Sequence, residues 1–179
     1  MDGPTVASPA LPSTAPPDAR ARHYDEVLAR IALLVDGEDD WIAALSTAAC
    51  ELHHAFGWFH WTGFYRRRAG ADLLVVGPYQ GGHGCLRITF DRGVCGAAAR
   101  TRATQRVPDV AAFPGHIACS STTRSEIVVP LFAGGDPAGE VVAVLDVDSD
   151  LPEAFSEIDQ AALERLAAML GRLWPGGAS

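Results

Sequence analysis

Residues 125–149 read SEIVVPLFAGGDPAGEVVAVLDVDS, and this stretch decides the fold that the sequence predicts. Two runs rich in Val and Ile flank the segment AGGDPAG, whose Gly, Asp and Pro residues are typical of a turn. Strands joined by so short a connection run antiparallel. The stretch therefore predicts a hairpin within an antiparallel sheet.

The segments on either side extend this pattern. Residues 58–67 and 72–80 predict two further strands, and short extended pieces are expected at 84–90 and 104–110. Helical spacing of apolar residues predicts helices within 23–40 and 39–56, a short alanine-rich helix within 92–103, and an amphipathic helix within 155–174. Asp39 or Asp40 can cap the second helix, and Ser156 with Asp159 resembles a capping box. The predicted fold class is α+β, with N- and C-terminal helices covering an antiparallel sheet.

Length and composition indicate one folded domain. The chain has 179 residues, and five of its twelve prolines fall within residues 1–20. We expect residues 1–20 to form a disordered Pro-rich tail, residues 21–174 a single domain, and residues 175–179 a short flexible end.

Charge and hydropathy narrow the function classes. A formal net charge of −8 argues against a nucleic-acid binder and against docking on anionic lipid. Neither a signal-peptide pattern nor a run of about 18 apolar residues is visible. A cytoplasmic protein is therefore expected, in a reducing compartment where the cysteines are core filler, metal ligands, or redox and catalytic groups.

The four cysteines differ in their surroundings. Cys119 lies in the polar loop FPGHIACSSTTR, with His116 and Arg124 nearby to favour a thiolate. Cys85 lies in the glycine-rich segment GGHGCLR. A functional thiol and an incidental loop cysteine are equally good interpretations of this residue. Cys95 lies near the start of the alanine-rich helix, so the helix dipole makes it a rival nucleophile, unless it only packs between glycines. Cys50 falls on or beside an apolar helix stripe and is interpreted as core.

Acidic and aromatic pairs share strand faces. Asp146 and Asp148 are two residues apart on one predicted strand, so both point to the same side. Glu126 heads the neighbouring strand and could complete an acidic cup that holds an ammonium group and donates a proton. Trp61 and Tyr65 are four apart and could wall an apolar pocket. The plainer alternatives are a solvated polar face for the acids and core packing for the aromatics.

Other chemistries lack their motifs. The sequence has no Cys-x-x-Cys or His-x-x-x-His pair for a metal, and no Gly-x-Ser-x-Gly for a hydrolase. It also lacks a glycine-rich phosphate loop. No metal and no organic cofactor are expected.

Taken together, several motifs resemble the free methionine-(R)-sulfoxide reductases, enzymes built on a single GAF domain. These motifs are WTGFY, GPYQG, GCLRITFDRGVCGAAA, TQRVPDV, FPGHIAC, SEIVVPL and VLDVDS, and they span about residues 25–170. The resemblance implies a six-stranded antiparallel sheet covered by helices. It also implies free methionine-R-sulfoxide as the substrate, thioredoxin as the reductant and, by analogy alone, a homodimer.

Roles for individual residues follow from the same resemblance. Cys119 would attack the sulfoxide sulfur, and Cys85 would resolve the resulting sulfenic acid as a disulfide, with Cys95 as helper or alternative resolver. Glu126, Asp146 and Asp148 would contact the polar groups of the substrate, and one of them would protonate the departing oxygen. Trp61 and Tyr65 would surround its methyl group.

A different class of function is compatible with the same residues. A GAF-type binding or redox-sensing module could carry these thiols without turnover. The chain also departs from the family pattern at Ser120, where an acid is common, and in the segment SSTTR. These departures concern the grip on the substrate more than the class of reaction.

Overall fold

The structure is a computed structural model that describes residues 9–115 and 121–176. Four α-helices and six strands follow one another in the order α1, α2, β1, β2, β3, α3, β4, β5, β6, α4. Their bounds are α1 Pro17–Leu34, α2 Trp41–Ala55, β1 Trp61–Arg67, β2 Leu73–Gln80, β3 Arg87–Thr89, α3 Gly93–Thr101, β4 Gln105–Val107, β5 Ser125–Phe132, β6 Val141–Ser149 and α4 Glu157–Arg172. Two short 3-10 helices lie at Val110–Ala112 and Ala133–Gly135.

The six strands form one antiparallel sheet in the order β3-β2-β1-β6-β5-β4. The hairpin predicted at 125–149 is confirmed, because β5 pairs with β6 from Ser125 opposite Ser149 onwards. β1 pairs with β2 on one side and with β6 on the other, although β1 and β6 are far apart in the sequence. The α+β prediction with a six-stranded sheet is therefore confirmed.

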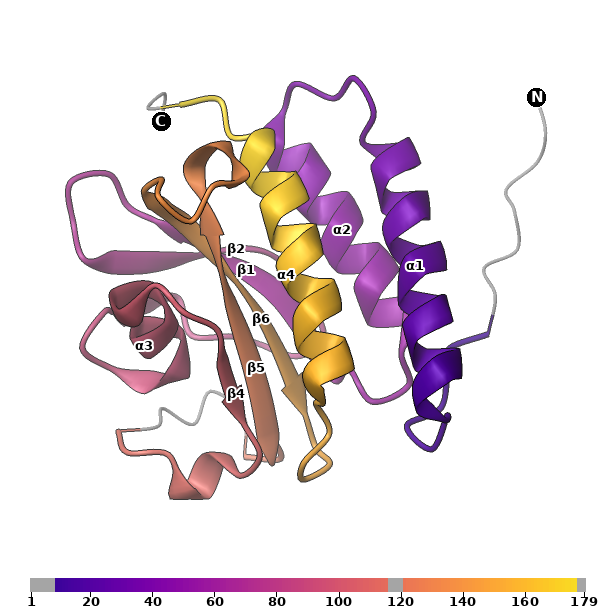
Figure 1. The fold of residues 1–179 in the computed structure, drawn as a ribbon. Coiled ribbons are helices and arrows are strands. Elements are labelled where there is room, and N and C mark those ends of the chain that lie inside the picture. The colour runs from indigo at the N-terminus through magenta and orange to yellow at the C-terminus, as the bar shows by residue number, and fades with distance from the viewer. Residues whose placement is uncertain (1–8, 116–120, 177–179) are drawn as a thin grey trace.

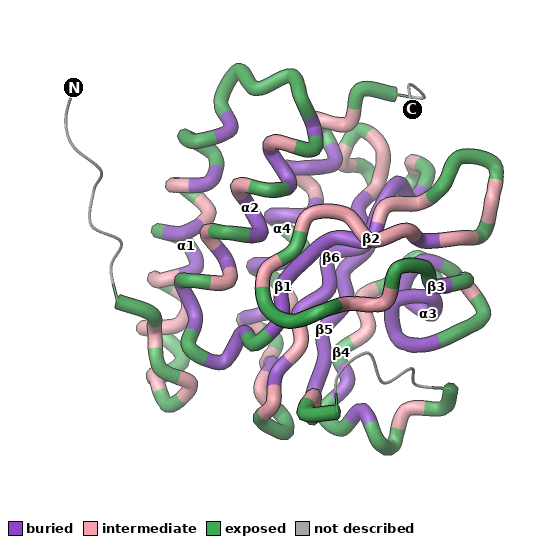
Figure 2. Tube along the Cα trace, turned by 180° about the vertical axis from the view of Figure 1, so that it is seen from behind, coloured by how far each residue is buried: buried purple, intermediate pink, exposed green. Residues whose placement is uncertain are grey.

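The two faces of the sheet carry different layers. α2 and α4 pack on one face with α1 against them, whereas α3 lies on the other face (Figure 1). The larger core fills the three-helix side, and a smaller core lies beneath α3. Figure 2 shows that the central strands β1, β6 and β5 are buried along most of their length. Side chains alternate between the two cores along these strands because successive residues point to opposite faces.

The N-terminal boundary of the domain needs a correction. α1 begins at Pro17, inside the predicted tail, because proline is well suited to the first turn of a helix. Leu11 forms a bridge with Phe56 and packs against the larger core. Residues 11–20 therefore include packed chain, and residues 1–8 lie outside the described part.

A buried carboxylate ties α1 to α4. Asp159, which is fully buried, accepts hydrogen bonds from Arg20 Nη1 at 2.8 Å and from the Tyr24 hydroxyl at 2.8 Å. The same carboxylate accepts the backbone N–H of Ser156 at 2.7 Å, which satisfies the start of α4 as the predicted capping box requires. The Asp159 side chain thus caps α4 and links it to α1.

α2 confirms one sequence expectation and overturns another. The side chain of Asp40 caps the helix by accepting the backbone N–H groups of Ile42 and Ala43. Cys50, interpreted as core, is exposed, because it lies beside the buried stripe of the helix and not on it. None of the described helices is hydrophobic enough over a sufficient length to span a membrane.

Candidate active site

Three acids lie together on the face of the sheet that α3 covers. Glu126 on β5 pairs directly with Asp148 on β6, and Asp146 lies two residues earlier on the same strand. Paired residues of neighbouring strands point to the same side of a sheet, so all three carboxyl groups share the α3 face. The structure thus brings together the three acids that the sequence singled out.

Burial controls the ionisation of these acids. Glu126 and Asp146 are 6% and 5% exposed. Burial, and next the charges of the neighbouring acids, raise the pKa of Glu126 and of Asp148 well above their ordinary values. Burial also raises the pKa of Asp146 to about 7, although hydrogen bonds with Cys95 and Glu126 oppose the rise. The cluster therefore retains protons at neutral pH.

Cys95 belongs to the acidic cluster. It lies on the first turn of α3, is 3% exposed, and hydrogen-bonds to Asp146. Burial, followed by the charges of Asp146 and Glu126, raises the pKa of its thiol well above the ordinary value. The expectation that the helix dipole would favour a Cys95 thiolate is therefore wrong, because desolvation and neighbouring acids outweigh the dipole.

The ligand atoms of Cys95, Glu126 and Asp146 lie within 4.8 Å of one another. This spacing is short enough for the one sulfur and two carboxylate ligands to hold a metal ion, although the sequence predicted no metal site. One oxygen of the cluster, Asp146 Oδ1, is buried without a hydrogen-bond partner among the described residues. The cluster thus offers a buried acceptor to an incoming polar group.

An aromatic wall stands beside the acids. Trp61 pairs with Asp148 across β1 and β6, and its ring stacks with Tyr65 at a centroid distance of 5.7 Å. Tyr79 of β2 stacks on the other side of Trp61 at 5.3 Å. Gly63 leaves room for this arrangement, because a Cβ there would lie 2.4 Å from Tyr79 Cβ and 2.6 Å from the Trp61 ring.

The loop that carries Cys85 is held against this wall. Trp61 Nε1 donates to the carbonyl of Gly82 at 3.1 Å, and the backbone of Cys85 hydrogen-bonds to the Tyr65 hydroxyl. Gly84 lies so close that an added Cβ would be 2.9 Å from Tyr65 Oη. Cys85 is disulfide-bonded, whereas Cys50 and Cys95 are free. Cys119, the predicted nucleophile, lies outside the described residues.

A pocket of about 520 Å³ opens beside Trp61 and Asp148. The rest of its lining comes from the end of β6, the Cys85 loop and the Ser/Thr segment of the predicted nucleophile loop, and consists of His60, Gly82, His83, Ser121, Thr122, Thr123 and Asp150. Polar residues thus make up most of the lining, and Trp61 adds an aromatic surface.

Sequence reasoning missed several residues that shape this site. Gly63 and Gly84 allow the aromatic rings and the Cys85 loop to approach, and Tyr79 extends the wall. The available signal was a glycine inside a strand pattern, which indicates a close approach of another group. Tyr79 could not be found by the spacing within one strand because it belongs to β2.

Comparison with known proteins agrees with this architecture. The family model described as GAF domain matches residues 40–173, which is most of the chain. The chain is therefore a GAF domain protein.

Curated relatives and solved structures narrow the class further. The chain is 40% identical to the free methionine-R-sulfoxide reductase of Saccharomyces cerevisiae, over 83% of this chain and 86% of that protein. It is 38% identical to the protein of the same name from Escherichia coli, over 78% and 81% of the two chains. The structure of the Neisseria meningitidis free methionine-R-sulfoxide reductase in complex with its substrate matches with a TM-score of 0.81 and 47% identity, over 87% and 90%. Within the GAF class, the chain belongs to the free methionine-R-sulfoxide reductase family.

Proposed function

We propose that this protein reduces free L-methionine-(R)-S-oxide to methionine by thiol chemistry. The observation that carries the proposal is the acidic trio Glu126, Asp146 and Asp148 beside the Trp61–Tyr65 wall. Glu126 and Asp146 are buried, Asp148 is partly buried, and Asp146 Oδ1 has no hydrogen-bond partner among the described residues. The named relatives support the same substrate. The proteins from Saccharomyces cerevisiae and Escherichia coli are both called free methionine-R-sulfoxide reductase, and the solved structure of the Neisseria meningitidis protein of that name is a complex with its substrate.

The acids can interact with two polar groups of the substrate, its ammonium group and its sulfoxide oxygen. A carboxylate of the trio can hold the ammonium group of a free amino acid, since a buried charge needs an opposite charge. The raised pKa values of the trio also keep a proton available near neutral pH, which the departing sulfoxide oxygen requires. The stacked rings of Trp61 and Tyr65 offer an apolar surface to the methyl group.

The proposed thiol chemistry has three steps. The Cys119 sulfur attacks the sulfoxide sulfur, and the oxygen passes to Cys119 as a sulfenic acid while methionine leaves. The Cys85 thiol then attacks the Cys119 sulfur, which forms a disulfide and releases water. A dithiol protein such as thioredoxin reduces that disulfide by two exchange steps and becomes oxidised itself.

Two facts support this assignment of the cysteines. Cys85 is disulfide-bonded, which suits a resolving cysteine, whereas Cys50 and Cys95 are free. Cys95 is buried with a raised thiol pKa, which suits a hydrogen-bonding group of the acidic cluster better than an initial nucleophile. Its role as an alternative resolver stays a prediction.

The direct experiment incubates the protein with racemic free methionine sulfoxide and dithiothreitol, and follows both epimers by chiral chromatography. We expect loss of the R epimer alone, and no loss with Cys119→Ser. Cys50→Ser is the matched control, because Cys50 is exposed on α2, away from the acidic cluster. Persistence of both epimers, or full activity in Cys119→Ser, would contradict the proposal and favour a GAF-type sensing module without turnover.

The resolving cysteine has its own test. Protein turned over once without reductant, then alkylated and digested, should give a Cys85–Cys119 disulfide by peptide mass. A Cys95–Cys119 disulfide in its place would reassign the resolver. Thioredoxin as the reductant and a homodimer stay predictions, and are measured by coupled turnover and by sedimentation.

A further inference from the structure

A second pocket lies where the start of α2 meets the end of β1 and the segment after α4. It has a volume of about 460 Å³. Its lining includes charged and apolar side chains, among them Asp39, Trp41, Ile42, Arg66, Arg67 and Trp174. None of them belongs to the acidic cluster or to its aromatic wall.

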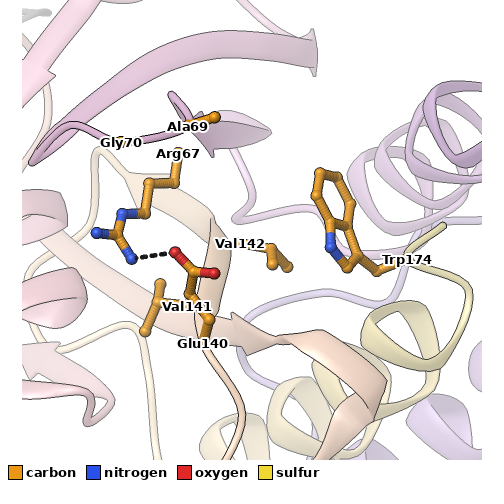
Figure 3. A pocket seen from close by; sticks show the side chains of 7 residues that line it. All are labelled: Arg67, Ala69, Gly70, Glu140, Val141, Val142 and Trp174. Atoms are coloured by element: carbon orange, nitrogen blue, oxygen red, sulfur yellow. Dashed lines mark hydrogen bonds and ion pairs between the residues drawn. The ribbon is translucent and has the colours of Figure 1, made fainter. Parts of the chain in front are cut away.

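Arg67 is already neutralised. Its guanidinium forms an ion pair with Glu140 at 2.7 Å, and Asp72 lies 3.5 Å away. Figure 3 shows Arg67 turned toward Glu140, with Trp174 on the far side of Val142, in an adjoining pocket of about 160 Å³. Arg67 thus contributes little unbalanced charge to the larger pocket.

Arg66 is not neutralised. It is half-buried, it has no ion pair with any described residue, and its Nε is shielded from solvent without an acceptor. Its stem lies over Gly77 of β2, where an added Cβ would be 3.3 Å from Arg66 Cγ. A shielded donor on a cation costs free energy unless an acceptor is supplied. The arginine therefore lines this pocket in need of an anionic oxygen.

An acid that forms no ion pair with any described residue lines the same pocket. Asp39 is exposed and has no hydrogen bond or ion pair through its carboxylate within the described part of the chain, whereas Asp40 is engaged as the cap of α2. No ion pair joins Asp39 to Arg66, although both line the pocket. The pocket thus has one acidic and one basic lining residue that do not neutralise each other through an ion pair.

The remaining wall is apolar and firmly held. Trp41 is 4% exposed, and its Nε1 donates to the carbonyl of Leu170 at 2.9 Å. Trp174 meets it edge-on with a centroid distance of 4.5 Å, and Ile42 is partly exposed beside them. Such a surface suits an aliphatic or thioether side chain.

We propose that this pocket binds a second free α-amino acid with an apolar side chain. Arg66 takes the carboxylate, Asp39 takes the ammonium group, and the side chain packs against Trp41 and Trp174. A ligand with both charges satisfies Arg66 and Asp39 together, which an anion or a cation alone cannot do. The inference does not rest on the reductase activity, because no residue of the pocket takes part in the proposed reaction.

The test is calorimetric titration of the whole protein with L-methionine. Because methionine is also the product of the proposed reaction, we expect two sites in the unaltered protein and one in Arg66→Gln. Arg68→Gln is the matched control, since Arg68 is exposed on the same segment and does not line the pocket. Asp39→Asn should weaken the same site by about tenfold, the loss expected for one charged hydrogen bond.

The outcomes separate the two proposals. Loss of one site in Arg66→Gln alone supports the inference, whether or not the acidic cluster binds methionine. Equal stoichiometry and affinity in Arg66→Gln and the unaltered protein would overturn it, as would equal losses in Arg66→Gln and Arg68→Gln. If Arg66→Gln fails to fold by circular dichroism, Asp39→Asn decides, and an unchanged affinity there overturns the inference.

Discussion

Glu126 and Asp148 face each other directly across β5 and β6, on the side of the sheet that α3 covers. Burial, and next the charge of Asp146, raise the pKa of both carboxyl groups well above their ordinary values, so both retain protons at neutral pH. A pair of acids that shares protons can both bind a cation and supply a proton.

Replacing one acid of the pair tests its part in the reaction. Glu126→Gln keeps the shape of the side chain but cannot deliver a proton of the same acidity. We expect kcat/KM for free methionine-R-sulfoxide to fall by about 10²-fold or more, the usual contribution of a positioned acid. Glu140→Gln, which alters only the Arg67 ion pair, should leave the rate unchanged. A Glu126→Gln enzyme with the unaltered rate would remove this glutamate from the mechanism.

Asp146 makes stability fall as the pH rises. Its pKa is raised to about 7 in the folded protein, so between its ordinary range and pH 7 the folded state binds more protons than the unfolded state. The free energy of unfolding should therefore decrease across that window, by about 4 kcal/mol at most for a shift of about three units. Asp146→Asn carries no ionisable proton and should lose this dependence.

Urea denaturation at pH 5 and pH 8 measures the effect. At each pH, the free energy of unfolding of the unaltered protein is compared with that of Asp146→Asn. Relative to the variant, the unaltered protein should lose stability between pH 5 and pH 8. A difference between the two proteins that stays constant with pH would show that the Asp146 carboxyl does not titrate in this window.

Gly84 should control the position of the Cys85 loop. Gly84→Ala adds a Cβ that meets the Tyr65 hydroxyl and the Trp61 ring, so the loop must move away from the wall. We expect slower disulfide formation after a single turnover, with a rise in KM. Gly82→Ala is the matched control, since an added Cβ at Gly82 meets nothing within 4 Å. Equal rates in the two variants would show that this contact does not position Cys85.

Asp159 should contribute more to stability than any surface ion pair. Asp159→Ala leaves the guanidinium of Arg20 and the Tyr24 hydroxyl without their shared acceptor, and it removes the cap of α4. We expect a loss of about 3–5 kcal/mol in the free energy of unfolding by urea denaturation. Asp18→Ala, which breaks an exposed pair with Arg22, should cost less than about 1 kcal/mol. Similar losses in both variants would contradict the special role of Asp159.

The two-residue period of strands explains why much of the site could be predicted. Asp146 and Asp148, like Trp61 and Tyr65, share a face by spacing alone, and the 125–149 hairpin places Glu126 beside the acids. Capping chemistry is equally local, so Asp40 and the Ser156–Asp159 box could be read directly.

The errors came from properties that depend on distant contacts. The thiol pKa of Cys95 is set by burial beneath α3 and by acids from β5 and β6, which outweigh its own helix. Cys50 is exposed because the rotation of α2 against the sheet, and not its apolar neighbours in sequence, decides its environment. α1 begins earlier than the sequence predicts, because Arg20 in its first turns is held by Asp159 and Ala154, which lie far from it in the sequence.

The placement of β1 between β2 and β6 has a consequence for biosynthesis. β6 is synthesised long after β1, so the edge of β1 that pairs with β6 stays without its hydrogen-bonding partner until β6 has emerged from the ribosome. Pairings of such long sequence separation form slowly and favour late, concerted folding. Nascent chains that stall before residue 141 would therefore lack both the strand that joins β1 to β5 and two of the three acids, and would be candidates for chaperone capture.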